Sequence, residues 1–193
     1  IGFALCTNSL NGSIPSELGA MTGMTIGFSL YTNSLSGSIP SELGAMTGMT
    51  IGFALYTNSL SGYIPSELGL LRAMTEYFYL HSNRLCGDIP ANVSRLSARI
   101  SGWDITTGNS LGTACCSPGH YESSTGSCTV CPIGRSSDSY SASECTACKA
   151  GTYVDTPGTY PCTQCPLGKA SNATIATNTS TCVDCSSNTF ADE

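Results

Sequence analysis

The residues best suited to chemistry in this chain are its cysteines. Of the 12 cysteines in 193 residues, all but Cys6 and Cys86 lie between positions 115 and 185. Eight of them form C-x-x-C pairs, at 128/131, 145/148, 162/165 and 182/185. Two such pairs can hold a zinc ion, one pair beside a βαβ unit can exchange thiols, and many pairs in an exported chain form structural disulfides. The spacing alone leaves these three open.

The context of the pairs favours structural disulfides. The pairs recur four times, whereas a zinc site closes at four ligands, and their spacers are rich in Ser, Thr and Gly with no βαβ pattern. Few large apolar residues lie between 115 and 185, so bridges must replace a hydrophobic core. We therefore expect no metal site, no cofactor and an oxidising, extracellular or cell-surface location.

The remaining polar residues form no readable catalytic constellation. The two histidines, His81 and His120, belong to different halves of the chain, without a Ser-His-Asp or Cys-His arrangement. Glu17, Glu42 and Glu67 recur at equal spacing, which indicates a solvated stripe. Charged residues make up 10% and the net charge is −6, which disfavours nucleic-acid binding. We expect no enzymatic activity.

The first half of the chain consists of copies of one 25-residue sequence. Residues 1–25 and 26–50 differ only at positions 4/29, 6/31 and 11/36, and 51–75 differs from 26–50 at six positions. A more diverged copy begins at Glu76, and a fifth begins at Trp103 with one extra residue before Asn109. Such periodicity predicts a solenoid in which each coil packs on its neighbours.

Each copy is expected to contain a strand, a turn and a return. Alternation places Phe28 and Leu30 on the core side of the strand and Ser29 and Tyr31 on the outer side. The segment SGxIP is expected to turn the chain, and SELGAMTGM to return as a short helix or irregular segment with Ser41 as N-cap. An asparagine then bonds the backbone of its own and the next coil. The ladder comprises Asn8, Asn33, Asn58, Asn83 and Asn109.

These residues resemble the plant-type leucine-rich repeat, L-x-x-N-x-L-S-G-x-I-P-x-x-L-G-x-L. The match runs through residues 1–100 and weakly to about 112. The resemblance implies a right-handed solenoid with a parallel sheet on its concave face. The departures are Met for Leu at 21, 24, 46 and 49, and one extra residue between Met24 and Phe28. We assign 1–112 to a leucine-rich-repeat solenoid of four to five coils, and 113–193 to a second domain.

The second domain resembles ephrin-receptor-like cysteine-rich repeats, which look related to tumour-necrosis-factor-receptor modules, over residues 115–185. The resemblance implies a small, mostly irregular or β rod in which the second cysteine of each pair bonds the first cysteine of the next. Cys86 is expected to pair with Cys115, Cys185 with a cysteine beyond Glu193, and Cys6 is left over. The pairs that the resemblance implies are Cys116–Cys128, Cys131–Cys145, Cys148–Cys162 and Cys165–Cys182.

Two kinds of surface site are predicted. N-linked glycans are expected at the four N-x-S/T sequons, and a binding face is expected from outward strand residues, because tyrosines on a sheet can stack on sugars or grip a partner chain. The sequons are Asn11, Asn92, Asn172 and Asn178. The binding face comprises Ser29, Tyr31, Tyr56, Tyr79 and His81.

These features predict an extracellular structural or adhesive glycoprotein, a scaffold or interaction module that assembles into a surface coat, appendage or filament. Its partners would be other protein chains, including copies of itself, or a polysaccharide. The alternative is the ligand-binding ectodomain of a leucine-rich-repeat receptor, although the outer face varies little from coil to coil. No apolar run is long enough to span a membrane. We expect the chain to be a piece of a longer exported protein.

Overall fold

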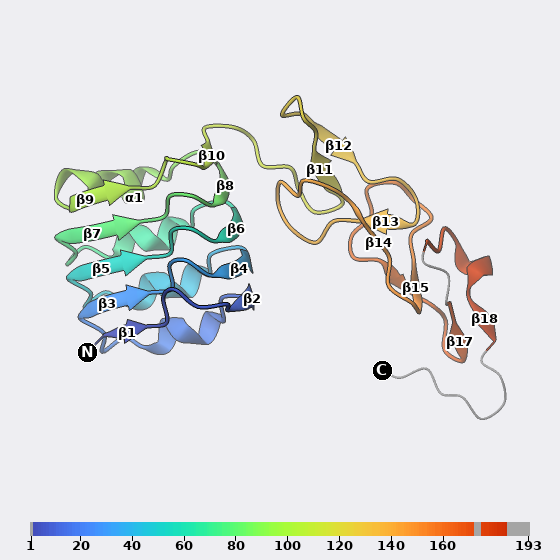
Figure 1. The fold of residues 1–193 in the computed structure, drawn as a ribbon, viewed down its shortest axis with the longest axis horizontal. Helices are drawn as coiled ribbons and strands as arrows, with labels where there is room; N and C mark the ends of the chain where they lie inside the picture. The colour runs from blue at the N-terminus through green and yellow to red at the C-terminus, as the bar shows by residue number, and fades with distance from the viewer. Residues whose placement is uncertain (1, 172–174, 185–193) are drawn as a thin grey trace. The chain divides into compact units, whose positions relative to one another are not determined.

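A computed structural model describes residues 2–171 and 175–184. Contacts divide the chain into two compact units, Ile1–Cys115 and Cys116–Glu193 (Figure 1). The first unit is a solenoid of five coils, numbered 1 to 5 along the chain, and the second is a chain of small hairpins. The assignment of domains to 1–112 and 113–193 stays a prediction.

The first sheet of the solenoid takes one strand from each coil, and all its strands are parallel. Every strand pairs with the strand one repeat away, as Phe28 pairs with Phe53. The sheet confirms the predicted strand positions (Figure 1). In spatial order its strands are β1 (Phe3–Ala4), β3 (Ile26–Ser29), β5 (Ile51–Ala54), β7 (Glu76–Tyr79) and β9 (Ser101–Asp104).

The core follows the predicted alternation. Phe28 and Phe53 are fully buried, and their ring centroids lie 5.6 Å apart in a stack that continues through every coil. The return segments close the core from the other side with fully buried residues such as Met46 and Met49. Among the described residues, coil 1 packs on coil 2 alone, and Leu5 is 41% exposed whereas the equivalent Leu30 is 3% exposed.

A second parallel sheet corrects the expectation that SGxIP merely turns the chain. A repeat offers an identical segment one coil away, so even residues typical of turns gain backbone partners by pairing in register. Gly37, at φ 77°, lets the chain leave the strand toward the return. In spatial order the strands are β10 (Ser110–Leu111), β8 (Arg84–Gly87), β6 (Ser59–Gly62), β4 (Ser34–Gly37) and β2 (Asn11–Ser13).

The extra residue of each repeat forms a kink inside the first-sheet strand. The register pairs Ile26 with Ile51 and Phe28 with Phe53, and it leaves out the residue between them. That residue has a left-handed backbone in each of coils 2 to 5: φ is 68° at Gly27, 80° at Gly52, 59° at Tyr77 and 77° at Gly102. A 25-residue period is thus accommodated without loss of strand pairing. Tyr77 adopts this conformation at a cost that glycine avoids.

The return segments are short helices packed closely on one another. The predicted N-cap is wrong, because Pro40 precedes the first turn and the Ser41 hydroxyl instead donates to the Glu42 carboxylate at 3.3 Å. Gly44 permits the close packing, since a Cβ there would overlap the carbonyl oxygen of Glu67 in the next coil. The segments are 3-10 helices η1 (Ser16–Ala20), η2 (Ser41–Ala45) and η3 (Ser66–Leu70), then α1 (Ala91–Ser94) and η4 (Arg95–Ala98).

The asparagine ladder joins the two sheets, but it reaches in the opposite direction from the one expected. Asn83 donates to the carbonyl oxygens of Leu80 in its own coil, at 3.0 Å, and Leu55 in the preceding coil, at 3.1 Å. Its Oδ1 accepts the N–H of Leu60 of the preceding coil at 3.0 Å. The Asn8 side chain bonds only Leu5 and Cys6 of its own coil. The asparagines of coils 2 to 5 therefore fasten their coils to the preceding one.

The second unit is a series of two-stranded antiparallel hairpins. Each hairpin is too small to bury a core of its own, and the few buried large side chains include Tyr153 and Val154. Within the described residues its only helix is η5 (Thr179–Thr181). The pairs are β11 (His120–Glu122) with β12 (Cys128–Val130), β13 (Arg135–Ser136) with β14 (Thr146–Ala147), β15 (Thr152–Tyr153) with β16 (Thr163–Gln164), and β17 (Lys169–Ala170) with β18 (Val183–Asp184).

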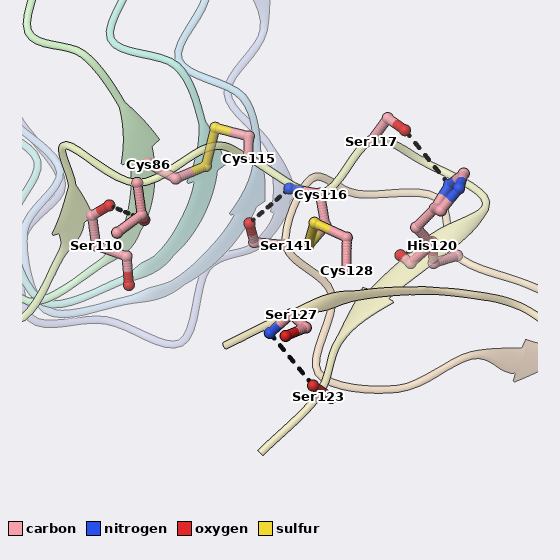
Figure 2. The surroundings of a disulfide bond; sticks show 12 residues. Cys86, Ser110, Cys115, Cys116, Ser117, His120, Ser123, Ser127, Cys128 and Ser141 are labelled. Carbon is pink, nitrogen blue, oxygen red and sulfur yellow. Dashed lines mark hydrogen bonds between the residues drawn. A yellow bond between two sulfur atoms is a disulfide. The ribbon is translucent and has the colours of Figure 1, made fainter. Parts of the chain in front are cut away.

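Five disulfides hold these elements. Cys86 and Cys115 bond across coils 4 and 5, beside the pairing of Ser110 with Cys86 (Figure 2). Cys6 is a free, half-buried thiol, and Cys185 lies outside the described residues. The bridges of the second unit join the same cysteines as the pairing given in the sequence analysis: Cys116–Cys128, Cys131–Cys145, Cys148–Cys162 and Cys165–Cys182.

Candidate functional site

The outer side of the first sheet carries a cluster of aromatic side chains. Because the strands are parallel and in register, residues one repeat apart form columns across the sheet. Where two neighbouring columns both carry aromatic residues, the rings of one column contact the rings of the other. The cluster, called the aromatic face below, consists of Tyr31, Tyr56, Tyr77, Tyr79 and His81.

One column of the aromatic face is a continuous ring stack. Tyr31 and Tyr56 lie 4.5 Å apart between centroids with 6° between their planes. Tyr56 and His81 lie 4.6 Å apart with 17° between planes. Tyr56 is therefore covered on both ring faces by its neighbours. The stack presents ring edges, two phenol groups and an imidazole nitrogen.

Coil 4 widens this stack into a patch. Tyr79 packs edge-on against Tyr56 at 6.0 Å and against His81 at 5.8 Å. Tyr77 follows at 6.1 Å from Tyr79, and its side chain is 47% exposed. Both rings lean over Gly102, where a Cβ would come within 2.6 Å of the Tyr79 hydroxyl and 2.9 Å of the Tyr77 ring. Gly102 thus leaves room for the two tyrosines.

Polar groups flank both ends of the aromatic face. At one end, the hydrogen bond and charge of Cys6 raise the pKa of Tyr31 to about 12, so this phenol stays neutral. At the other end lies Asp104. Burial opposes ionisation there, but N–H donors from Thr107 and Thr106 at 3.1 Å and the charge of His81 lower the Asp104 pKa. Coil 5 therefore places a negative charge at this end of the aromatic face.

The structure brings together four of the five predicted binding-face residues. Ser29 lies in the same sheet, between Ala4 and Ala54, but takes no part in the ring contacts. Two further residues near this face, Tyr77 and Asp104, were not predicted from the sequence. Tyr77 stands where the preceding coils have glycine, and Asp104 continues the column of Tyr79. A departure from the repeat at fixed spacing is the signal that identifies such residues.

The predicted glycan acceptors lie in different environments. Asn11 and Asn178 are exposed, although Asn178 Oδ1 already accepts from the Ser180 N–H at 3.0 Å. Asn92 donates one of its two amide N–H groups to the Ser66 carbonyl oxygen at 2.6 Å. Asn172 lies outside the described residues. Glycosylation of all four stays a prediction.

The described ranges contain neither a group of three metal-ligating His, Cys, Asp or Glu side chains nor a helix long and apolar enough to cross a membrane.

In comparison with known proteins, the solenoid is similar to ectodomains of plant receptors. No family model and no curated protein matches the chain. Among solved structures, a TDR receptor shares 30% identity over 57% of this chain (TM-score 0.52). The ectodomain of the membrane receptor kinase GASSHO1/SCHENGEN3 from Arabidopsis thaliana, in complex with CASPARIAN STRIP INTEGRITY FACTOR 2, shares 36% over 55% (TM-score 0.51). The Arabidopsis receptor kinase HAESA, with an IDA peptide hormone, shares 30% over 56% (TM-score 0.50).

This chain spans only 18%, 12% and 18%, respectively, of those three structures. The likeness supports the plant-type leucine-rich repeat and confirms the predicted fold class of a repeat solenoid joined to a disulfide-rich region. The resemblance of the second unit to ephrin-receptor-like repeats stays a prediction.

Proposed function

We propose that this chain is the ligand-recognition part of an extracellular receptor, and that its solenoid binds a peptide ligand through the aromatic face. The carrying observation is the concentration of aromatic rings on one sheet of a solenoid that is similar to receptor ectodomains. Aromatic residues dominate binding hot spots because they bury much area with little loss of conformational freedom.

The receptor is better supported than the coat, appendage or filament that near-identical repeats suggest. Coils 1 to 3 carry almost the same outer residues, but coil 4 replaces small residues by Tyr77 and Tyr79, and coil 5 adds Asp104. A lattice contact between identical copies gains nothing from such a local change. Recognition of one specific ligand gains from it, because the shape and the charge of the binding face then differ along the solenoid.

The ring geometry also favours a peptide over the polysaccharide considered in the sequence analysis. Sugars stack on open ring faces, whereas Tyr56 is covered on both faces by Tyr31 and His81. The stack instead offers phenol and imidazole groups that exchange hydrogen bonds with a peptide backbone. Asp104 would favour a basic residue at one end of that peptide.

The test is selection of a displayed library of random dodecamer peptides on the full chain with its disulfides intact. Selected peptides are then titrated by calorimetry against Tyr56→Ala/Tyr79→Ala and against Tyr63→Ala. Tyr63 is a matched control because its side chain is also exposed, at 51%, but it lies directly after β6 of the second sheet, outside the aromatic face. The double variant is expected to weaken binding at least tenfold, and the control variant is expected to leave it unchanged.

Equal losses in both variants, or no peptide that distinguishes wild type from the double variant, would refute the proposed site. Fibres of the purified chain in electron micrographs, together with no selectable peptide, would instead support a structural protein that assembles into filaments.

A further inference from the structure

Three arginines line one hollow on the return side of the solenoid, remote in the fold from the aromatic face. The hollow has a volume of about 250 Å³ and lies where the returns of coils 3 and 4 meet. The whole chain has seven Lys and Arg residues and a net charge of −6, so this local gathering of positive charge is exceptional. The lining residues are Gly69, Arg72, Asn92, Arg95, Leu96 and Arg99.

Among the described residues, none of these arginines forms an ion pair with a carboxylate. The ion pair found in the described part of the chain joins Lys169 and Asp184, in the other unit. Glu17, Glu42 and Glu67 occupy one position in coils 1 to 3, and the equivalent position in coil 4 is Asn92. Coil 4 therefore brings no carboxylate of its own to this position beside the arginines.

The same departures from the repeat create the charge. Arg72 stands where coils 1 and 2 have threonine, and Arg95 stands where they have alanine. Coil 4 thus has the neutral Asn92 in place of a glutamate, and Arg72 of coil 3 and Arg95 of coil 4 line the same hollow. Because the substitutions converge on one hollow, they are not spread as general surface charge.

The hollow has a fixed floor. Two hydrogen bonds hold the Asn92 side chain. Its amide N–H donates to the Ser66 carbonyl oxygen, and its Oδ1 accepts a hydrogen bond from the Val93 N–H at 3.1 Å. Gly69 lies directly below, and a Cβ there would come within 2.6 Å of the Asn92 amide. Leu96, 3% exposed, adds an apolar wall that strengthens electrostatic attraction. The arginine heads are the parts free to close on a ligand.

We propose that this hollow binds a tetrahedral oxyanion, the sulfate or phosphate ester group of an extracellular ligand. Guanidinium groups pair with such oxyanions through two parallel hydrogen bonds, and three of them match a doubly charged group. The volume suits one such group rather than a drug-sized molecule. The negative charge of the rest of the chain disfavours a long polyanion. The site is independent of the peptide proposed for the aromatic face.

The hollow also bears on the sequon at Asn92. Its amide nitrogen is engaged with Ser66, and a glycan there would fill the hollow. Anion binding therefore requires Asn92 to be unmodified. Peptide mapping of the chain from glycosylating cells is expected to show an unmodified Asn92, and full glycan occupancy there would overturn the proposal.

The direct test is calorimetric titration of the full chain with sodium sulfate and sodium phosphate at constant ionic strength in chloride. Saturable one-to-one binding is expected for wild type, with at least a tenfold loss in Arg95→Gln/Arg99→Gln. Arg84→Gln is the matched control, because Arg84 is exposed but lies in β8 outside the hollow. It is expected to bind as wild type does.

The pH dependence separates the two oxyanions. Phosphate binding should strengthen as pH rises through the second pKa of inorganic phosphate, because the dianion then replaces the monoanion, whereas sulfate binding should stay constant. Unfolding midpoints followed by Trp103 fluorescence verify that each variant is folded. Equal affinity in wild type and the double variant, or equal losses in the control, would overturn the proposal, as would a non-saturable response that follows ionic strength alone.

Discussion

The asparagine ladder makes a position-dependent prediction for a single substitution. Asn83 is 7% exposed and bonds four backbone groups: the N–H of Leu60 and the carbonyl oxygens of Leu55, Leu80 and His81. In Asn83→Ala the carbonyl oxygens keep other donors, namely Asn58 for Leu55, Asn109 for Leu80 and the Thr57 N–H for His81. The buried Leu60 N–H loses the side-chain oxygen that accepts from it. One unsatisfied buried group costs about 1–3 kcal/mol, and the lost hydrogen bonds to the carbonyl oxygens add to that cost. We expect the free energy of unfolding to fall by about 2–4 kcal/mol.

The same substitution in coil 1 supplies the control. The Asn8 side chain bonds only the carbonyl oxygens of Leu5 and Cys6, at 3.2 and 3.0 Å. Asn8 and Leu5 are exposed and Cys6 is half-buried, so water can replace the lost side-chain donor. Asn8→Ala should cost less than about 1 kcal/mol. Asn33, half-buried and bonded to the preceding coil, should fall between the two.

The assay is urea unfolding with the disulfides intact, followed by fluorescence of Trp103. This is the only tryptophan of the chain, and it stacks on Phe78 at 4.8 Å in the solenoid. An unchanged slope with urea would assign the shift in midpoint to stability. Equal costs at Asn8 and Asn83, or a cost below about 1 kcal/mol at Asn83, would refute the reasoning that the ladder stabilises coil contacts by satisfying buried backbone groups.

Three further predictions follow from packing, chain connectivity and charge. Gly44→Ala should destabilise the solenoid by more than about 2 kcal/mol in the same assay, because its Cβ would overlap the next coil, whereas Gly23→Ala, with open space around the new Cβ, should stay within about 1 kcal/mol of wild type. Replacing Cys86 and Cys115 together by serine should cost about 3–4 kcal/mol, since the bridge closes a loop with a sequence separation of 29; a thermal midpoint equal to that of wild type would contradict this. The lowered pKa of Asp104 implies a contribution to stability that is complete above the pKa of about 4 in the unfolded chain and is lost as pH falls through the pKa in the folded protein. Asp104→Asn should therefore make the free energy of unfolding less dependent on pH in the acid range, and an unchanged pH dependence would exclude that contribution.

Much of the fold could be predicted from the sequence because a solenoid turns sequence period into spatial proximity. Residues 25 apart must lie in adjacent coils, so the buried Phe28–Phe53 column and the ladder positions followed from spacing alone. The second sheet did not, because Gly and Pro in SGxIP read as turn residues. Their pairing depends on an identical neighbour held one coil away, which local propensity does not describe.

The candidate site divides in the same way. The column of Tyr31, Tyr56 and His81 follows from the period, because its members share one position in the repeat. Contacts between different columns depend on the lateral offset of neighbouring strands and helices, which the period leaves undetermined. Only the tertiary structure therefore placed Tyr79 against Tyr56 and gathered three arginines around Asn92. By itself the sequence determined the columns, and the packing of coil on coil decided which columns meet.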